Sequence, residues 1–269
     1  MSAGVLPGDG EDLTFTRIGV AGPGRRHHSQ GGPVTWITDW AQASAGVHWA
    51  DVSEKAAKTS LRPFLLADMP GPPGRPWGTP AGDGDEVIST PLDTTAIDQL
   101  DAAQVLGGWW PGPSEEELAE DEDLRTVFAP FGERFPGLAP AIAGELDPEL
   151  MRRALYQYTR HARIGLVPAQ RPADVLARLG WQGAVNSRST ADITAVLRSW
   201  EDRFGARLLE VGFAGIRLLV SRPPRTLEAA LPIAAEHFAF SEEAHGGLRS
   251  VDAIARAMVG NPFWDFWWD

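Results

Sequence analysis

The sequence predicts an α/β (α+β) protein with a mixed or antiparallel sheet and helices packed on it. Residues 189–240 predict this class because they combine helical periodicity with helix caps and turn signals. Short apolar or β-branched runs bounded by glycine and proline predict strands, and the chain closes on the aromatic run NPFWDFWWD at residues 261–269. The C-terminal half is therefore expected to have the element order β-α-α-β-β-α-α-β.

The composition is that of a globular protein with an acidic surface. Hydrophobic residues make up 43 % of the 269 residues, which is enough for a sizeable core. The formal net charge of −12 repels phosphate backbones and anionic membranes, so we expect neither a nucleic-acid partner nor a membrane partner. The length allows one large domain or two smaller ones, and we expect an N-terminal α/β part at 1–145 and a C-terminal α+β domain at 146–269.

The residue types that are missing exclude several kinds of chemistry. The chain has no cysteine, which excludes disulfides, thiolate catalysis, cysteine-ligated zinc and iron–sulfur clusters. The N-terminus MSAGVLPGDGEDL lacks the basic and apolar regions of a signal peptide, and no apolar run approaches the ~20 residues that span a bilayer, so we expect a cytoplasmic protein. No dinucleotide-binding, P-loop, GxSxG or kinase motif is present, and we expect no cofactor.

The N-terminal half is expected to begin β-β-α-β. Residues 13–20 alternate as a strand does, and residues 22–33, rich in glycine, proline, arginine and histidine, predict an exposed loop. Residues 34–40 are β-branched and aromatic and predict a second strand. Helical spacing follows at residues 43–58, and residues 61–67 form an apolar run of strand length.

The middle of the chain predicts loops and short helices. The density of proline and glycine excludes regular structure at residues 70–86. Residues 91–106 predict one helix, capped by Asp93 or Thr94. The acidic run at residues 115–123 predicts a solvated helix face or a disordered surface, with binding of a basic partner as the weaker alternative.

The C-terminal half begins with a helix, a strand and two further helices. Residues 146–161 predict the first helix, residues 163–169 the strand, and residues 171–181 a compact helix. Ser189 fits the N-cap of the next helix, and Gly205 is placed as its left-handed C-cap.

The remainder of the C-terminal half predicts a hairpin, two helices and a final strand. Residues 206–211 and 215–221 are the strands of the hairpin. Thr226 caps the helix that follows, and Ser250 begins the last helix. Residues 263–268 predict a strongly aromatic final strand.

These segments resemble a bacterial family known as domain of unknown function 4253. The resemblance is strongest over 163–269 and rests on the segments GLVPA (165–169), RPADVLARLGW (171–181), RSWEDRFGARLLEVG (198–212), RPPRTLEAA (222–230) and FWWD (266–269). Similar members often carry a cysteine and an aspartate where this chain has Ser241, Glu242 and Glu243, so no role of that cysteine applies here. The resemblance implies a bacterial, intracellular α/β protein and brings no established activity.

Arg222 and Arg225 are the first candidate ligand-binding residues. With Thr226 they lie at a predicted strand-to-helix junction, where arginine, free N–H groups and the helix dipole can bind a carboxylate or phosphate. The simpler interpretation is a Pro-Pro turn whose arginines are solvated or pair with Glu228. Both interpretations stay open.

Glu236 and His237 are the second candidates, because carboxylates and imidazoles lie close together in this part of the sequence. The group continues with Glu242, Glu243 and His245, and such side chains can form a metal or general-base site. Their spacing matches no ligand motif, and adjacent helical residues point about 100° apart. A surface helix end with a polar loop is the simpler interpretation, and we expect no metal site and no catalytic residue.

Aromatic residues supply the remaining candidates. Trp181 and Asn186 flank a glycine-containing turn, where they either line a ligand pocket or serve packing and turn formation. Eleven tryptophans are many for this length, and Trp109, Trp110 and Trp267 are candidates for a partner surface or an aromatic pocket. If the last strand is central, Trp267 is covered, whereas an edge position leaves it available for binding.

Two functional hypotheses follow. The favoured one is a non-enzymatic binding or regulatory protein that holds a protein partner through exposed aromatics and an acidic surface, and an immunity role fits this class. The alternative is a small enzyme or small-molecule binder with a polar pocket near Arg222, Arg225, Glu236 and His237. The sequence indicates no oligomeric state.

Overall fold

The structure is a computed structural model that describes residues 24–28, 34–38, 44–66, 90–158, 162–241 and 250–268. Some expectations lie outside these residues, namely the strand at 13–20, the irregular segment at 70–86, and the positions of Glu242, Glu243 and His245. The side chains of His27 and His28 also lie outside what is described.

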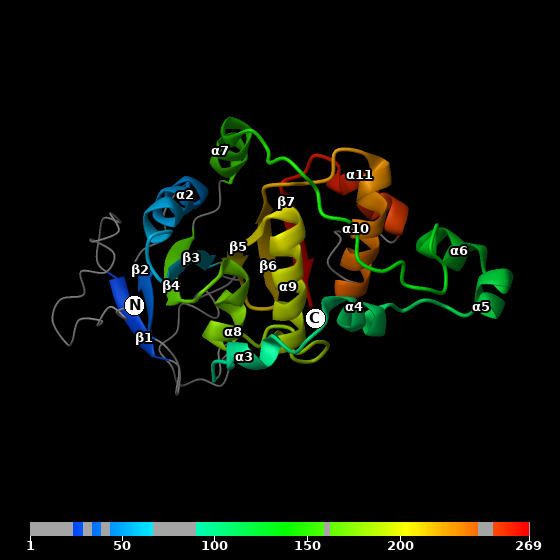
Figure 1. Cartoon of the computed structure of the whole chain (residues 1–269), viewed down its shortest axis with the longest axis horizontal. Helices are drawn as coiled ribbons and strands as arrows, with labels where there is room; N and C mark the ends of the chain where they lie inside the picture. Colours follow the sequence, from blue (N-terminus) through cyan, green and yellow to red (C-terminus); the bar gives the residue numbers. More distant parts are fainter. Residues whose placement is uncertain are drawn as a thin grey trace.

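One seven-stranded sheet runs through the described chain in the order β1-β2-β4-β3-β5-β6-β7 (Figure 1). Its strands are Gly24–His28 (β1), Val34–Thr38 (β2), Leu61–Leu66 (β3), Arg163–Pro168 (β4), Ala206–Val211 (β5), Gly215–Val220 (β6) and Phe263–Trp267 (β7). Neighbouring strands are antiparallel except for β3 and β5, which are parallel. The sheet is therefore mixed, and the α/β (α+β) class is confirmed.

The helices connect these strands and cover the sheet. They are Ala45–Ala56 (α2), Thr94–Ile97 (α3), Ala102–Trp109 (α4), Glu115–Glu120 (α5), Glu122–Phe128 (α6), Pro148–Gln157 (α7), Val175–Leu179 (α8, after a 3-10 turn at Pro172–Asp174), Thr190–Phe204 (α9), Leu227–Phe240 (α10) and Val251–Met258 (α11). From β4 onwards the order is β4-α8-α9-β5-β6-α10-α11-β7, which fits the expected β-α-α-β-β-α-α-β.

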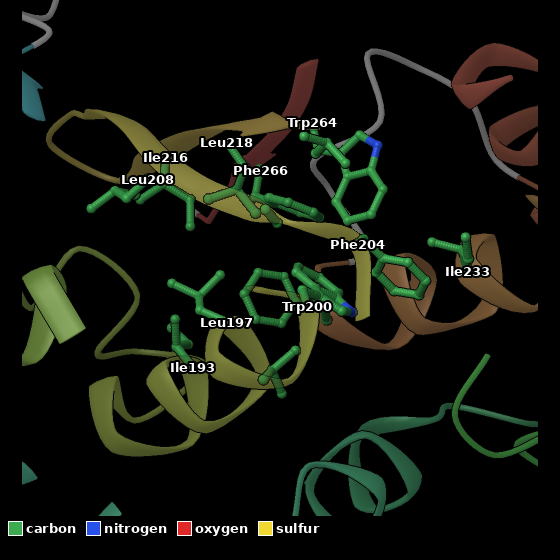
Figure 2. Packing of buried hydrophobic residues seen from close by; sticks show 14 of the residues in the cluster. Ile193, Leu197, Trp200, Phe204, Leu208, Ile216, Leu218, Ile233, Trp264 and Phe266 are labelled. Atoms are coloured by element: carbon green, nitrogen blue, oxygen red, sulfur yellow. The ribbon is translucent and has the colours of Figure 1, made fainter. Parts of the chain in front are cut away.

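The larger hydrophobic core lies between the sheet and the helices α4, α8, α9, α10 and α11. Figure 2 shows α9 directing Leu197, Trp200 and Phe204 toward the sheet, where Leu218 and Phe266 face them. These α9 residues recur every three or four positions, so they form one apolar face of the helix. Burial of that face holds α9 against the hairpin β5–β6.

The smaller core covers the other face of the sheet, over β2, β4, β3, β5 and β6. Trp49 of α2 and Leu155 of α7 pack there with Leu65 of β3. The indole Nε1 of Trp49 donates to the carbonyl oxygen of Pro63 at 3.0 Å, which fixes α2 to the strand beneath it. Phe263 of β7 is only partly buried at the margin of this core.

Strand β4 lies between two strands of the N-terminal half. It pairs with β2 through Trp36 and Leu166, and with β3 along its whole length from Leu61 opposite Pro168 to Leu66 opposite Arg163. Strand β3 in turn joins β4 to β5. Strands from both halves thus share one sheet, and the division at 145/146 into two parts stays a prediction.

The loop expected at residues 22–33 is wrong for Gly24–His28, which is strand β1. It pairs with β2 in register, with Gly24 opposite Thr38 and His28 opposite Val34. Pairing with a neighbouring strand satisfies the backbone of this segment whatever its local composition, so the propensity of glycine and arginine for loops does not decide its conformation.

The single helix expected over residues 91–106 is two helices, α3 and α4. Asp93 caps α3 by accepting a hydrogen bond from the amide of Thr95 at 3.0 Å. Asp101 caps α4 by accepting one from the amide of Gln104 at 2.9 Å. A second side-chain cap in the middle of the run starts a new helix, because the capping residue itself has an extended backbone.

Candidate functional site

Glu236 is fully buried in the larger core. Its carboxylate accepts four hydrogen bonds, all of 2.7 Å: one from the amide of Ala139, one from Nε1 of Trp200, and two from Nη1 and Nη2 of Arg203. A buried carboxylate is tolerated only when it is paired and hydrogen-bonded in this way. These contacts tie α9 and the segment around Ala139 to α10.

His237 lies in the same core, within a ring of aromatic side chains. The imidazole centroid is 4.4 Å from that of Trp264, 4.8 Å from that of Phe266 and 5.0 Å from that of Trp200. The expected surface position of Glu236 and His237 is wrong, because Arg203 pairs with the carboxylate of Glu236 inside the core and aromatic rings surround the imidazole of His237. Neither side chain opens to solvent.

Arg222 and Arg225 lie together near the C-terminal end of α9. Nη2 of Arg222 donates to the carbonyl oxygens of Asp202, at 2.8 Å, and Glu201, at 3.4 Å. These are C-terminal carbonyls of α9, where the helix dipole favours a cation. Arg225 donates to the carbonyl oxygen of Glu145 at 3.3 Å, and Nη1 of Arg222 lies 3.9 Å from the carboxylate of the same residue.

The four residues of the proposed polar pocket thus form two separate pairs. Glu236 and His237 are core residues, whereas Arg222 is partly exposed and Arg225 is exposed. The sequence reasoning missed Arg203, the ion-pair partner of Glu236. Its signal is its position three residues after Trp200, because both side chains then reach Glu236 from the same side of α9.

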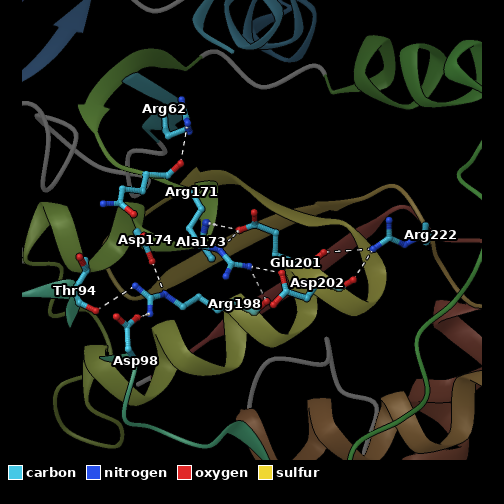
Figure 3. A network of polar contacts seen from close by, with 11 residues as sticks. Arg62, Thr94, Asp98, Arg171, Ala173, Asp174, Arg198, Glu201, Asp202 and Arg222 are labelled. Atoms are coloured by element: carbon cyan, nitrogen blue, oxygen red, sulfur yellow. Dashed lines mark hydrogen bonds and ion pairs between the residues drawn. The ribbon is translucent and has the colours of Figure 1, made fainter. Parts of the chain in front are cut away.

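An ion-pair network covers the outer side of α9 near α3 and α8 (Figure 3). Arg198 binds Asp174 and Asp98, each at 2.6 Å, and Arg171 binds Asp202 at 2.6 Å. Burial alone would lower the pKa of Arg198, but the hydrogen bonds and charges of Asp174 and Asp98 outweigh it and raise that pKa above its ordinary value. Each charged group of this network pairs with a group of opposite charge. These ion pairs join α9 to α3 and to the turn before α8, which are distant from it in sequence.

Trp181 and Asn186 occupy different environments. Trp181 is completely buried, donates from Nε1 to the carbonyl oxygen of Gly212 at 2.9 Å, and packs edge-to-face on Trp268 at 5.7 Å between centroids. Asn186 is exposed in the turn that precedes α9. The first is therefore a packing residue and the second a turn residue, and they do not face each other across a common surface.

Trp110 is buried and Trp109 is half-buried, both at the end of α4. Trp110 lies 5.5 Å from Phe128 and 5.9 Å from Phe238 between ring centroids, and its Nε1 donates to the carbonyl oxygen of Gly132 at 3.2 Å. The guanidinium of Arg188 covers Trp109 at 4.9 Å. These contacts use both indoles to pack α4 and α6 on the body of the protein.

Trp267 is the exposed member of the aromatic strand. It lies on β7, the last strand of the sheet order, and 40 % of its surface is exposed. Its neighbours Trp264, Phe266 and Trp268 point to the opposite face and are buried in the larger core. The sequence does not decide between a central and an edge position for this strand. The structure places it at the end of the sheet order, with the indole of Trp267 in solvent.

A polar row crosses β5, β6 and β7 beside Trp267. Glu210 lies opposite Arg217, and Arg217 lies opposite Asp265. Arg217 donates to Asp265, and Tyr158 donates from its hydroxyl to Glu210. Burial alone would lower the pKa of Arg217, but the hydrogen bond and charge of Asp265, with the charge of Glu210, raise that pKa. The sequence reasoning missed this row, because cross-strand neighbours are set by register.

We call Arg217, Asp265, Trp267 and the edge of β7 that no described strand pairs with the β7 edge surface. It combines an exposed indole, a half-exposed carboxylate and a paired guanidinium on one side of an edge strand. Such a surface can bind another chain through aromatic packing and directed polar contacts.

A family model matches the C-terminal segment of the chain. The fold is an α/β protein with a mixed sheet and one aromatic edge strand. Residues 163–269 match the protein-family model described as Domain of unknown function (DUF4253), which confirms the resemblance found in the sequence. No curated protein and no solved structure matches the chain.

The described residues include neither a membrane-spanning helix nor a cluster of metal ligands. Within the described part of the chain, no helix combines the length and the apolar character that crossing a bilayer requires. The same residues contain no group of three or more histidine, aspartate or glutamate side chains placed to hold a metal ion.

Proposed function

We propose that this protein is a non-enzymatic binding or regulatory protein of the bacterial cytoplasm that acts through protein contacts. The observation that carries this proposal is the exposure of Trp267 on the edge strand of the sheet. Tryptophan is enriched among the residues that dominate protein–protein binding energy, because one side chain buries a large rigid area. An immunity role is one form that such binding takes.

The contacts of the other candidate residues support a binding protein over a small enzyme. The carboxylate of Glu236 has all its hydrogen bonds inside the core, and His237 is enclosed by aromatic rings. Arg222 and Arg225 bind backbone carbonyls at the end of α9 and at Glu145. The small-enzyme or small-molecule alternative near these four residues stays a prediction, and it has the weaker support because they lie in two places.

The test is capture of partners from native lysate by the full chain and by two single variants. Trp267→Ala removes the exposed indole, and Tyr156→Ala is the matched control because Tyr156 is an exposed aromatic residue on α7. We expect Trp267→Ala to lose a partner that the parent chain and Tyr156→Ala both retain. Circular dichroism checks that each variant is folded. Equal capture by all three folded proteins would contradict the proposal.

A further inference from the structure

The backbone of β7 alternates between groups that face β6 and groups that face outward. The amide of Trp268 donates to the carbonyl oxygen of Ala214, and the amide of Val220 donates to that of Pro262, both at 2.8 Å. In an antiparallel pair, hydrogen-bonded residues alternate with residues whose backbone groups point away. With this register, residues 264 and 266 bond to β6, and the backbone groups of Phe263, Asp265 and Trp267 point outward.

Two of these outward groups already have partners. The carbonyl oxygen of Trp267 accepts from the hydroxyl of Ser241 at 2.6 Å, and the amide of Phe263 donates to Oδ1 of Asn261 at 3.0 Å. Four groups remain between them: the carbonyl of Phe263, the amide and carbonyl of Asp265, and the amide of Trp267. Within the described part of the chain no residue hydrogen-bonds to these four groups, and we call them the open ladder of β7.

We propose that this open ladder binds an extended basic segment of a partner protein as an added strand. The proposal rests on the proposed function and deepens it. A strand centred opposite Asp265 would exchange two main-chain hydrogen bonds with that residue and accept a third from the amide of Trp267. Its alternate side chains would then lie beside the carboxylate of Asp265 and the indole of Trp267.

Charge decides which kind of segment fits. The carboxylate of Asp265 has 52 % of its side-chain surface exposed, and the row beside it carries two carboxylates, Glu210 and Asp265, against the single guanidinium of Arg217. The whole chain has a net charge of −12. A lysine or arginine opposite Asp265 is therefore favoured, and an apolar residue two positions along would pack on Trp267.

The same charges disfavour a second copy of this chain. An antiparallel pair of β7 strands centred on this ladder would place Asp265 opposite Asp265, and like charges directly opposite each other destabilise a strand pair. Each copy would also bring the full negative charge of the molecule. The partner is thus a different chain whose extended segment is basic.

The test uses two fluorescently labelled seven-residue peptides, one alternating lysine with valine and one alternating glutamate with valine. Binding to the full chain is measured by fluorescence polarisation, and amide hydrogen exchange is measured with and without the lysine peptide. We expect the lysine peptide to bind, the glutamate peptide not to bind, and the amides of Asp265 and Trp267 to become protected in the complex. A lack of binding by the lysine peptide, or binding without this protection, would overturn the proposal.

Three variants separate main-chain from side-chain binding. Trp267→Pro removes the outward amide but no bond to β6, and Trp267→Ala removes the same indole while keeping the amide. We expect Trp267→Pro to bind the lysine peptide about tenfold more weakly than Trp267→Ala, the effect of one lost hydrogen bond. Asp265→Lys should reverse the preference toward the glutamate peptide. If Trp267→Pro unfolds, the exchange measurement on the parent chain decides the result alone.

The outcomes also distinguish this proposal from the proposed function. Equal peptide affinity of folded Trp267→Pro and Trp267→Ala would overturn strand addition and leave binding through the indole intact. Partner capture that survives Trp267→Ala would instead contradict the proposed function. A dimer seen by analytical ultracentrifugation and dissociated by Trp267→Pro would assign the ladder to a second copy and overturn the basic partner.

Discussion

Arg203 and Glu236 form a two-point ion pair that joins α9 to α10 inside the larger core. Nη1 lies 2.7 Å from Oε1, and Nη2 lies 2.7 Å from Oε2. The carboxylate side chain is fully buried, whereas 14 % of the arginine side chain is exposed. Because the carboxylate is removed from water, the loss of either partner would leave the other as an unpaired charge in the core, which lowers the stability of the fold.

Glu236→Ala is therefore expected to lower the free energy of unfolding by about 3–5 kcal/mol. The loss arises because Arg203, the indole N–H of Trp200 and the amide of Ala139 all lose their acceptor. Urea denaturation with an unchanged m-value measures it. Glu228→Ala, at an exposed position on the same helix, is the control and should cost less than about 1 kcal/mol. Equal losses for the two variants would contradict the assigned role of the pair.

Trp264 and Trp267 are expected to respond differently to truncation. Trp264 is 2 % exposed and packs on Phe204 and His237, so Trp264→Ala should cost about 3–5 kcal/mol of unfolding free energy. Trp267→Ala, at the exposed edge, should cost about 1 kcal/mol. Guanidinium denaturation of both variants measures the difference. A larger loss for Trp267 would mean that its indole is part of the core.

Gly205→Ala should lower stability, because Gly205 ends α9 with a φ of 63°. A Cβ atom there would also lie 2.1 Å from Oγ of Ser221. Strain in the left-handed region and this contact together should cost more than about 1 kcal/mol. Gly108→Ala is the matched control, since Gly108 lies within α4 with no atom near its added Cβ, and it should gain about 0.4–1 kcal/mol. Thermal unfolding of both variants measures the expected loss of stability for Gly205→Ala and the expected gain for Gly108→Ala.

The start of α5 should lose stability in acid. Hydrogen bonds from the backbone and side chain of Ser114 lower the pKa of Glu117 below its ordinary value of 4.5. Between the folded and the unfolded pKa of Glu117, the unfolded chain binds more protons than the folded chain. The stabilisation from the Glu117 carboxylate is therefore complete above pH 4.5 and is lost as the pH drops through the folded pKa. NMR titration of the Glu117 carboxyl measures that pKa, and Ser114→Ala should return it toward 4.5. The backbone N–H of residue 114 keeps its hydrogen bond in this variant, so an unchanged titration would exclude the Ser114 hydroxyl as a cause.

The periodic elements could be predicted from the sequence, and the long-range pairings could not. Helix α9, with its Ser189 cap and Gly205 end, and the hairpin β5–β6 follow from local patterns. Strand β1 does not, because only its pairing with β2 makes it a strand. The break between α3 and α4 was readable in principle from the capping residue Asp101.

The candidate site shows the same division. Alternation along β7 predicts that Trp267 faces away from Trp264, but sheet order decides whether that face is exposed. Burial of Glu236 depends on Arg203, which lies far from it in sequence, and the spacing of Arg203 from Trp200 does not by itself name Glu236 as the partner. Local chemistry therefore identified the residue types, and tertiary pairing determined their environments.

The place of β3 in the sheet has a consequence for synthesis of the chain on the ribosome. Both neighbours of Leu61–Leu66 lie later in the sequence, β4 at Arg163–Pro168 and β5 at Ala206–Val211. Until about a hundred further residues have been translated, this apolar segment has no strand to pair with, and exposed unpaired strands favour aggregation of nascent chains. Early release of the chain upstream of β4 would leave β3 without either of its neighbours, so the pairing of β3 waits for the segment that begins at Arg163.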